Sequence, residues 1–294
     1  MTHAPPQAGS VQTIVLDGLA LAQKLRGEMA DEIAKRVAEG SRPPCLAVVR
    51  VGDDPASASY IKGKRRAAAR IGMQAVEHHL AEMTPEPELL ELIETLNRDP
   101  GVDGILVQLP LPPQIRPNAV AAAIDPTKDV DGVGPLNAGR LLMGEDGLFA
   151  CTPLGILEVL DHHRVPIEGA HAVVIGRSMI VGKPISLLLQ RRNATVTMCH
   201  SRTRGLADFC RSADILVAAT GRPRMVKRGW VKPGAAVIDV GVSEVDGKLV
   251  GDVDFEALLG VAGLLTPHRR GIGPMTITML LHNTLLAHRA RMGA

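Results

Sequence analysis

The sequence predicts an α/β protein built on parallel sheets, and two observations carry this prediction. Short aliphatic runs alternate along the chain with longer segments whose apolar residues recur at helical spacing. Aromatic residues make up only 2% of the chain although 46% of it is hydrophobic, so the core must consist mainly of Ala, Val, Leu and Ile. Strands of parallel sheets are covered on both faces and read as continuous aliphatic runs of this kind.

The first half of the chain supplies the elements of one domain. Segments 21–40 and 53–72 have helical spacing and end on glycine, and segment 85–101 is opened by proline and closed by Asp-Pro-Gly. Aliphatic runs at 44–52 and 102–112 predict buried strands. Such alternation indicates βα units and a parallel sheet.

A second block begins near Cys151. Strands are predicted at 170–176, 193–201, 213–221 and 234–242, with a helix over 182–192 after the first of them. The last segment is an amphipathic helix. We therefore expect a first domain over residues 1–150, a second over 151–275, and a terminal helix over 276–294 that packs back on the first domain.

Composition excludes several classes of function. A net charge of +2 and the scarcity of aromatic residues argue against a nucleic-acid partner. The four cysteines form no CxxC or metal-ligand spacing, and no apolar run approaches the roughly 18 residues that a membrane span needs. The first ten residues are polar and proline-rich, which predicts a disordered tail rather than a targeting signal. We expect a cytoplasmic protein with free thiols and no metal.

The start of the second block has the order strand, glycine turn, helix. Gly176 and Gly182 bracket the turn, and Pro184 suits the first turn of the helix. Backbone N–H groups at such a helix start can bind a phosphate. Because the spacing is not GxGxxG, an ordinary βα turn remains the alternative.

The end of the next strand favours a nucleotide with a 2′-phosphate. An NAD site carries an acidic residue at this place, whereas an arginine accommodates NADP. Here Ser201, Arg202 and Arg204 follow the strand without an acid, and Arg177 lies in the glycine turn. The sequence indicates NADP, and the alternative is a solvated basic loop.

Tyr60 and Lys64 lie four residues apart in a predicted helix and therefore share one face. They can be a surface pair or an acid/base pair. Short-chain dehydrogenases use the same spacing, but there the pair follows the glycine turn, whereas Tyr60 precedes Gly176 by a whole domain. The pair must therefore reach a cofactor across a cleft.

Many short motifs carry a resemblance to a known family. They are, in chain order, "SYIKGK", "DGILVQLPLP", "KDVDG", "NAGRL", "CTPLG", "GRSMIVGKP", "NATVTMCHSRT", "ADILVAATG", "KPGAAVIDVGV", "GDVDF" and "GIGPMT". Over about residues 12 to 290, the chain resembles the bifunctional methylenetetrahydrofolate dehydrogenase/methenyltetrahydrofolate cyclohydrolases. The resemblance implies an N-terminal α/β substrate domain, a Rossmann-like NADP-binding domain with a parallel sheet, and a cleft between them.

The resemblance also implies two reactions on tetrahydrofolate derivatives. The methylene carbon between N5 and N10 gives a hydride to NADP+, and water then opens the methenyl product to 10-formyltetrahydrofolate. It implies a homodimer built through the nucleotide domain. Alternatives are a variant with one activity, with an altered folate substrate or with NAD, and a non-catalytic protein that binds NADP or folate.

The site residues follow from the matching motifs. Catalytic roles fall on Tyr60, Lys64, Gln108 and Asp131. Further folate contacts fall on Val107, Leu109, Gly271, Gly273, Pro274 and Thr276. Nucleotide contacts are expected at Gly176, Arg177, Ser178, Ser201, Arg202 and Val242.

The hydrolytic step asks for a proton acceptor, and Lys64 can serve only if its pKa falls toward neutrality. The Gln108 amide could hold Lys64, and Asp131 could pair with the amino and N3–H edge of a pterin. Without the resemblance, Asp129 and Asp131 would be turn acids. The pairs His78–His79 and His162–His163 are interpreted as solvated.

One loop departs from the family. The family usually reads "TPVPGGVGPMT", and this chain reads "TPHRRGIGPMT", so His268, Arg269 and Arg270 replace Val, Pro and Gly. An arginine poorly replaces a glycine that needs positive φ. The two cations could bind the glutamate tail of a polyglutamylated folate or lie in solvent.

Overall fold

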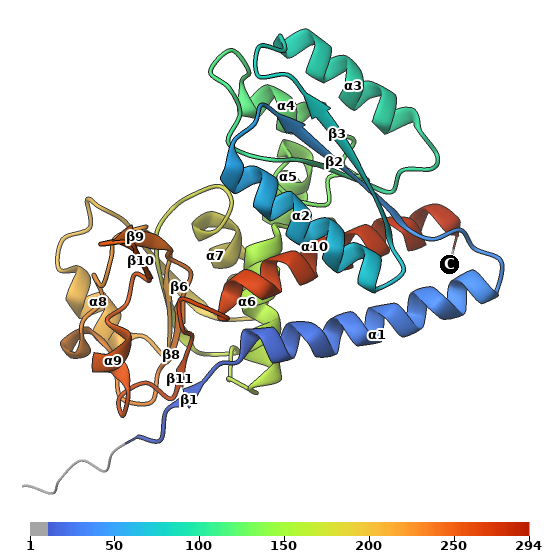
Figure 1. The fold of residues 1–294 in the computed structure, drawn as a ribbon. Coiled ribbons are helices and arrows are strands. Elements are labelled where there is room, and N and C mark those ends of the chain that lie inside the picture. Colours follow the sequence, from blue (N-terminus) through green and yellow to red (C-terminus); the bar gives the residue numbers. More distant parts are fainter. Residues whose placement is uncertain (1–10, 294) are drawn as a thin grey trace, which may run out of the picture. The chain divides into compact units, whose positions relative to one another are not determined.

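The computed structural model describes residues 11–293, drawn in Figure 1. The chain divides by its contacts into two compact units. The "six-stranded unit" comprises residues 11–18 and 159–273, and the "three-stranded unit" comprises residues 19–158 and 274–293. The predicted tail, residues 1–10, lies outside the described residues.

The contact boundaries differ from those predicted at 150/151 and 275/276. Residues 11–18 group with the second block because strand β1 (Ile14–Val15) pairs with β11 (Leu264–Leu265). Residues 151–158, the first part of helix α6 (Cys151–His162), group with the three-stranded unit.

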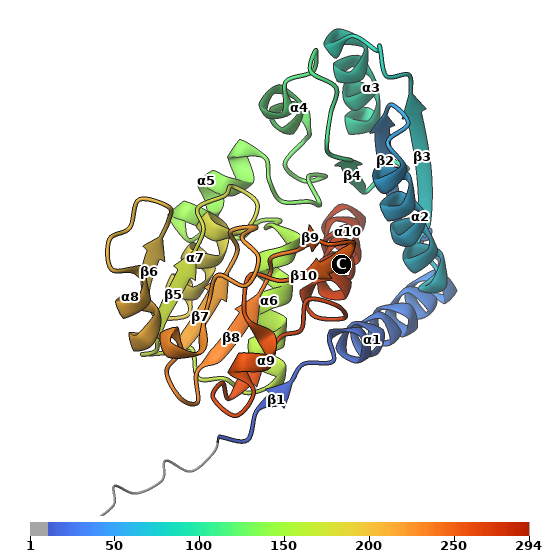
Figure 2. The ribbon, with the colours of Figure 1, turned by 60° about the vertical axis from the view of Figure 1, so that its left-hand side comes forward.

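The three-stranded unit is built on the buried strand β2 (Cys45–Val51), which lies between two parallel neighbours (Figure 2). Strand β4 (Gly104–Val107) is fully buried, as its aliphatic sequence predicts. The other neighbour, β3 (Gln74–Leu80), was not predicted. It is an edge strand rich in polar residues, so no aliphatic run marks it.

Local chemistry fixes the helices around this sheet. Helix α2 (Pro55–Arg70) begins where the Asp54 carboxylate accepts the Ser57 N–H at 2.7 Å, with proline at the first helical position. Helix α3 (Glu86–Arg98) buries Leu89, Ile93 and Leu96 in a cluster with residues of β2 and β4. The remaining helices are α1 (Gly18–Ala38), α4 (Pro117–Ala123) and α5 (Pro135–Met143).

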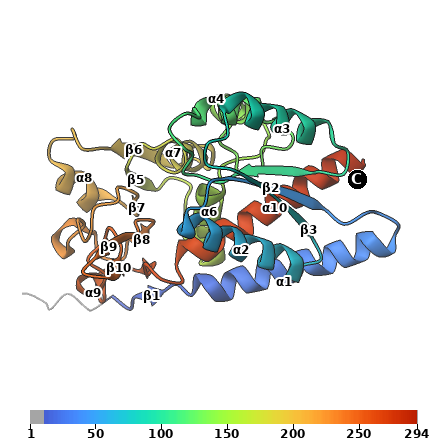
Figure 3. The ribbon, with the colours of Figure 1, turned by 45° about the horizontal axis from the view of Figure 1, so that its top comes forward.

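The terminal helix α10 (Ile272–Met292) runs beside α1 (Figure 3). Arg26 of α1 donates from Nε to Thr278 Oγ1 at 2.9 Å, and Glu32 of α1 forms an ion pair with Arg289 of α10. From residue 274 onward α10 is therefore a helix of the three-stranded unit.

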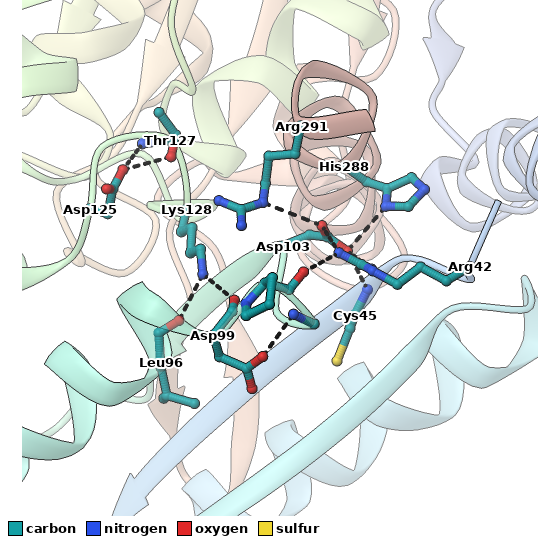
Figure 4. A network of polar contacts seen from close by, with 12 residues as sticks. Arg42, Cys45, Leu96, Asp99, Asp103, Asp125, Thr127, Lys128, His288 and Arg291 are labelled. Carbon is teal, nitrogen blue, oxygen red and sulfur yellow. Dashed lines mark hydrogen bonds and ion pairs between the residues drawn. The ribbon is translucent and has the colours of Figure 1, made fainter. Parts of the chain in front are cut away.

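A buried carboxylate also ties α10 to this unit (Figure 4). Asp103 is fully buried just before β4 and accepts two 2.7 Å hydrogen bonds from Arg42, as well as the backbone N–H of Cys45 at 2.9 Å. From α10, His288 Nδ1 lies 3.2 Å and Arg291 Nε 3.8 Å from this carboxylate. A buried charge needs such partners to offset its loss of hydration.

Lys128 lies in the same region (Figure 4) and is fully buried. Its Nζ donates to the carbonyls of Leu96 at 2.8 Å and Asp99 at 2.7 Å, which end α3. A cation at this end satisfies carbonyls that the helix leaves unpaired. Burial lowers the pKa of Lys128. We conclude that Lys128 has a structural role.

The six-stranded unit contains one parallel sheet with the order β1-β11-β8-β7-β5-β6. The chain passes from β5 (His171–Ile175) to β6 (Thr195–Cys199) on one side, then to β7 (Ile215–Ala218) on the other. Ligands of open α/β sheets bind at the carboxyl ends of strands where the order reverses in this way. The other elements are α7 (Gly182–Arg191), α8 (Leu206–Ser212), β8 (Ala236–Asp239), β9 (Ser243–Val245), β10 (Lys248–Val250) and α9 (Phe255–Leu258).

None of the described helices is both long and apolar enough to cross a membrane. Within residues 11–293 there is also no group of three His, Cys, Asp or Glu side chains that could hold a metal ion.

We expect Asp103→Asn to lower the free energy of unfolding by about 3 kcal/mol, because it removes the buried carboxylate that Arg42, Arg291 and His288 share. Urea denaturation followed by circular dichroism measures this. The control is Glu94→Gln, which removes an exposed carboxylate paired with Arg98 on α3 and should change little. Equal effects of the two substitutions would contradict the assignment.

Candidate active site

Lys64 and Gln108 are brought together by two elements of the three-stranded unit. Lys64 lies on α2 and Gln108 directly follows β4, and Lys64 Nζ donates to Gln108 Oε1 at 2.8 Å. Gln108 Nε2 donates in turn to the Leu109 carbonyl at 2.7 Å. Since a carbonyl accepts only from the amide nitrogen, this bond turns Oε1 toward Lys64.

The environment of Lys64 disfavours its charge. Burial lowers the pKa of Lys64, and the nearby Asp131 and Cys151 oppose this shift. Burial likewise raises the pKa of Asp131, while Lys64 lowers it. Burial holds the pKa of Cys151 well above its ordinary value, so this thiol stays protonated. The three groups interact electrostatically, so the protonation of Lys64 and that of Asp131 influence each other.

The two acids of the predicted turn have different surroundings. Asp129 is 1% exposed and accepts from the backbone N–H groups of Gly132 at 3.1 Å and Gly134 at 2.8 Å and from Asn137 Nδ2 at 3.0 Å. Asp129 is therefore a turn acid, one of the two predicted alternatives. Asp131 is only partly buried and lies beside Lys64.

Tyr60 lies one turn before Lys64 on α2, and 62% of its surface is exposed. Because of this exposure, the Tyr60 ring is accessible for stacking. The Tyr60 phenol has no hydrogen bond within residues 11–293. Val107 is buried at the end of β4, whereas Leu109 is 47% exposed. The strand end thus presents Gln108 and Leu109 to one side of α2.

The other predicted folate contacts lie around the start of α10. Thr276 pairs with Thr152 through their hydroxyls at 2.9 Å, and the Pro274 carbonyl accepts from Arg26 Nη2 at 2.9 Å. Gly271 and Gly273 belong to the six-stranded unit. A Cβ on Gly271 would lie 2.1 Å from the Pro267 carbonyl oxygen, so only glycine fits there.

The loop that departs from the family places its two arginines differently. Arg270 has a φ of 60°, a conformation that favours glycine, and its Nη2 lies 2.7 Å from Asp17 Oδ2. This ion pair holds Arg270 within the six-stranded unit. Arg269 is exposed and has no ion pair within the described part of the chain.

A hollow of about 320 Å³ lies at the carboxyl ends of β5, β6 and β7. Gly176, which directly follows β5, lines this hollow and has a φ of 127°. A Cβ added to Gly176 would lie 2.2 Å from the Ala219 carbonyl oxygen. A Cβ on Gly182 would lie 2.2 Å from the Gly176 carbonyl oxygen. The lining residues are Ile175, Gly176, Arg177, His200, Ser201, Leu206, Ala219, Thr220, Arg222 and Met225.

Some of the residues that were predicted to contact the nucleotide line this hollow. It includes Gly176, Arg177 and Ser201, but Ser178, Arg202 and Val242 are not among its lining residues. The Ser178 hydroxyl accepts from the backbone N–H groups of Val181 at 3.1 Å and Gly182 at 3.3 Å, so it shapes the turn before α7.

Sequence reasoning missed Arg222 as a lining residue. It follows the end of β7 as Ser201 follows the end of β6. The carboxyl ends of parallel strands meet at one edge of the sheet. The reasoning that selected the residues after β6 therefore also predicts Arg222 after β7.

His79 is exposed and His78 partly exposed, which agrees with the prediction that the first histidine pair is solvated. His78 and His79 lie in β3, and His79 Nε2 is 3.1 Å from Asp53 Oδ1 and 3.2 Å from the Gly52 carbonyl oxygen. Because the sequence did not predict β3, it did not predict these partners of His79 either. His162 and His163 meet edge to face, with ring centroids 5.0 Å apart.

We expect Asp131→Asn to lower the pKa of Lys64 further, because it removes a negative charge that stabilises the ammonium. Nuclear magnetic resonance of ¹⁵Nζ-lysine-labelled protein measures the titration, with Lys64 assigned by its loss in Lys64→Arg. The exposed Lys62 on the same helix serves as internal reference. An unchanged or raised Lys64 midpoint would show that Asp131 does not act on Lys64.

Two family models together match most of the chain. Residues 16–131 match the catalytic domain of tetrahydrofolate dehydrogenase/cyclohydrolase, and residues 150–292 match its NAD(P)-binding domain. The Bifunctional protein FolD of Halothermothrix orenii is 53% identical over 277 residues, covering 94% of this chain and 98% of that protein.

Solved structures agree with these matches. The bifunctional FolD methylenetetrahydrofolate dehydrogenase/cyclohydrolase of Campylobacter jejuni superposes with a TM-score of 0.93 at 42% identity, covering 95% of this chain and 99% of that one. The dehydrogenase-cyclohydrolase of Trypanosoma brucei, solved with NADP cofactor and inhibitor, has a TM-score of 0.89 at 38% identity and covers 96% and 99%. This chain belongs to the tetrahydrofolate dehydrogenase/cyclohydrolase family.

Proposed function

We propose that this protein oxidises 5,10-methylenetetrahydrofolate with NADP+ and hydrolyses the 5,10-methenyl product to 10-formyltetrahydrofolate, with Lys64 as the general acid/base. The observation that carries the role of Lys64 is its contact with Gln108 in surroundings that lower its pKa. The family of the chain supports the pair of reactions.

The hydrolytic step uses the neutral amine of Lys64. Gln108 Oε1 accepts one of its N–H groups, so the lone pair is free to take a proton from water. The water oxygen bonds to the methenyl carbon, and the bond from that carbon to N5 then breaks. N5 takes a proton, which the Lys64 ammonium can supply. The hydroxyl of the intermediate releases its proton to solvent as its oxygen becomes the carbonyl, and the formyl group remains on N10. Burial lowers the pKa of Lys64 in the direction that this role requires.

The oxidative step depends mainly on positioning, because the hydride passes directly from the methylene carbon. NADP, when bound, supplies the nicotinamide that accepts this hydride. The hollow in the six-stranded unit fits such a dinucleotide, since its glycine turn leaves no room for side chains and Arg177, Ser201 and Arg222 offer donors without an acid. The structure of the Trypanosoma brucei relative with NADP supports this choice.

Asp131 and Tyr60 are proposed to hold the folate. The Asp131 carboxylate can accept from the amino group and N3–H of the pterin, which is a planar two-point match. The exposed ring of Tyr60 offers a face for stacking. Lys64 and Asp131 are both present and close together, so nothing favours a non-catalytic binding protein or a single-activity variant.

The oligomer and the compartment are also proposals. A cytoplasmic homodimer joined through the six-stranded unit fits the family resemblance, and β6 ends its sheet with a free edge. Light scattering of the purified protein tests the dimer, and a monomer at micromolar concentration would reject it.

We expect Lys64→Met to lower hydrolysis of supplied methenyltetrahydrofolate by about 10² to 10⁴-fold, because no other amine replaces the base. Decay of the methenyl absorbance above the uncatalysed rate measures this. Lys62→Met, two residues away on the exposed side of α2, is the matched control and should keep the activity. Full activity of Lys64→Met would remove Lys64 from the mechanism.

We propose that Arg269 favours polyglutamylated folates, because both arginines of its loop are exposed but within residues 11–293 only Arg270 has an ion pair, with Asp17. Arg269→Gln should raise the KM for a pentaglutamate substrate about threefold and leave the KM for the monoglutamate unchanged, in line with an exposed ion pair. Arg270→Gln is the control and should not change the ratio of the two KM values. An unchanged ratio in Arg269→Gln would dismiss the proposal.

A further inference from the structure

One amide of α10 reaches into the backbone that carries Asp131. Asn283 is 1% exposed, and its Nδ2 lies 2.9 Å from the Val130 carbonyl oxygen and 2.9 Å from the Phe149 carbonyl oxygen. Both partners are acceptors only, so the amide must turn its NH₂ group toward them and use both of its protons. The orientation of this side chain is thereby fixed.

The two carbonyls belong to segments that meet at the Asp131 carboxyl. The Val130 carbonyl is part of the peptide group that leads into Asp131, and the Phe149 carbonyl lies two residues before Cys151. The Cys151 thiol is 3.2 Å from the Val130 carbonyl oxygen and within hydrogen-bonding reach of the Asp131 carboxyl. Asn283 therefore links the backbone at Val130, directly before Asp131, to the backbone at Phe149, two residues before Cys151.

The same backbone is confined on its other sides. Gly132 has a φ of 68°, and an added Cβ would lie 2.1 Å from the Phe149 carbonyl carbon. Val130 is fully buried against Gly104 of β4, where an added Cβ would lie 2.6 Å from Val130 Cγ1. The residues on both sides of Asp131 are thus fixed, while its own side chain remains partly exposed.

The helix that carries Asn283 is itself well anchored. His288 and Arg291, further along α10, reach the buried Asp103 (Figure 4). Arg289 pairs with Glu32 of α1. A site residue keeps its geometry only when its supporting shell is rigid, and α10 provides such a support for the Asn283 amide.

We propose that Asn283 is a positioning residue that sets the place of the Asp131 carboxylate for folate binding. The Asn283 amide holds the Val130 and Phe149 segments together by donating to both carbonyls. Asp131 directly follows Val130, so its backbone position depends on this link. The proposal rests on the function proposed for Asp131 as the pterin anchor. Asn283 does not touch substrate and acts only through the backbone.

Calorimetric titration with tetrahydrofolate and, separately, with NADP+ tests the proposal. Asn283→Leu keeps the approximate volume and removes both donors, and we expect tetrahydrofolate to bind about tenfold more weakly because the Val130 and Phe149 carbonyls lose the donor that they share. The Kd for NADP+ should stay unchanged. The matched control is Thr284→Val, since Thr284 is a fully buried neighbour whose hydroxyl donates only to Leu280 of its own helix; it should leave both Kd values unchanged.

A double substitution separates positioning from general destabilisation. If Asn283 acts through Asp131, Asn283→Leu should weaken tetrahydrofolate binding little further in an Asp131→Ala background. A full additional tenfold loss there would overturn the proposal, as would an unchanged Kd for tetrahydrofolate in the single variant. If Asn283→Leu does not fold, Asn283→Ser carries the same test, since its hydroxyl can serve only one carbonyl, with an expected loss of about threefold.

The two proposals fail in distinguishable ways. If Asp131→Ala alone leaves tetrahydrofolate binding unchanged, the proposed anchor role of Asp131 is wrong. If Asp131→Ala weakens binding and Asn283→Leu does not, Asp131 is the anchor and the positioning role of Asn283 is wrong.

Discussion

The partial burial of the Lys64 amino group is the constraint on which the rest of the candidate site depends. An ammonium in that place loses hydration, and the Gln108 carbonyl oxygen and the nearby Asp131 and Cys151 compensate for part of this loss. The net effect lowers the pKa of Lys64, which favours the neutral amine. A lysine in open solvent would remain charged at neutral pH and could not accept a proton from water.

Several buried polar groups hold the elements that carry Lys64, Gln108 and Asp131 in place. Asp129 organises the turn, while Asp131, two residues later, remains available to a ligand. Asp103 secures α10 to β4, the strand that Gln108 directly follows. Asp129 and Asp103 each have fixed donors, which offset the cost of burying a carboxylate.

Much of this could be predicted from the sequence. The aliphatic strands, the glycine turn at Gly176 and the contact of Lys64 with Gln108 follow from local pattern and from the resemblance to a family. The strands and the glycine turn leave a local signal, whereas the contact of Lys64 with Gln108 followed from the family resemblance. The family and its two reactions were likewise evident from the ordered motifs, and the comparisons agree.

The remainder depends on contacts between distant parts of the chain. Strand β3 is polar because it is an edge strand, so periodicity could not reveal it or the partners of His79. The pairing of Arg270 with Asp17 and the bonds of Asn283 to Val130 and Phe149 join residues far apart in sequence. The grouping of residues 11–18 with the six-stranded unit arises from one short strand pairing.

Lys64→Arg provides the most direct test of the central claim that Lys64 acts as a base. A guanidinium keeps the positive charge of Lys64 but cannot be deprotonated at neutral pH. The measurement is hydrolysis of supplied methenyltetrahydrofolate, with NADPH formation from methylenetetrahydrofolate followed on the same preparation. We predict that the arginine variant loses at least about a hundredfold in hydrolysis while NADPH formation persists. Hydrolysis at the wild-type rate would contradict the account, because a permanent cation would then suffice.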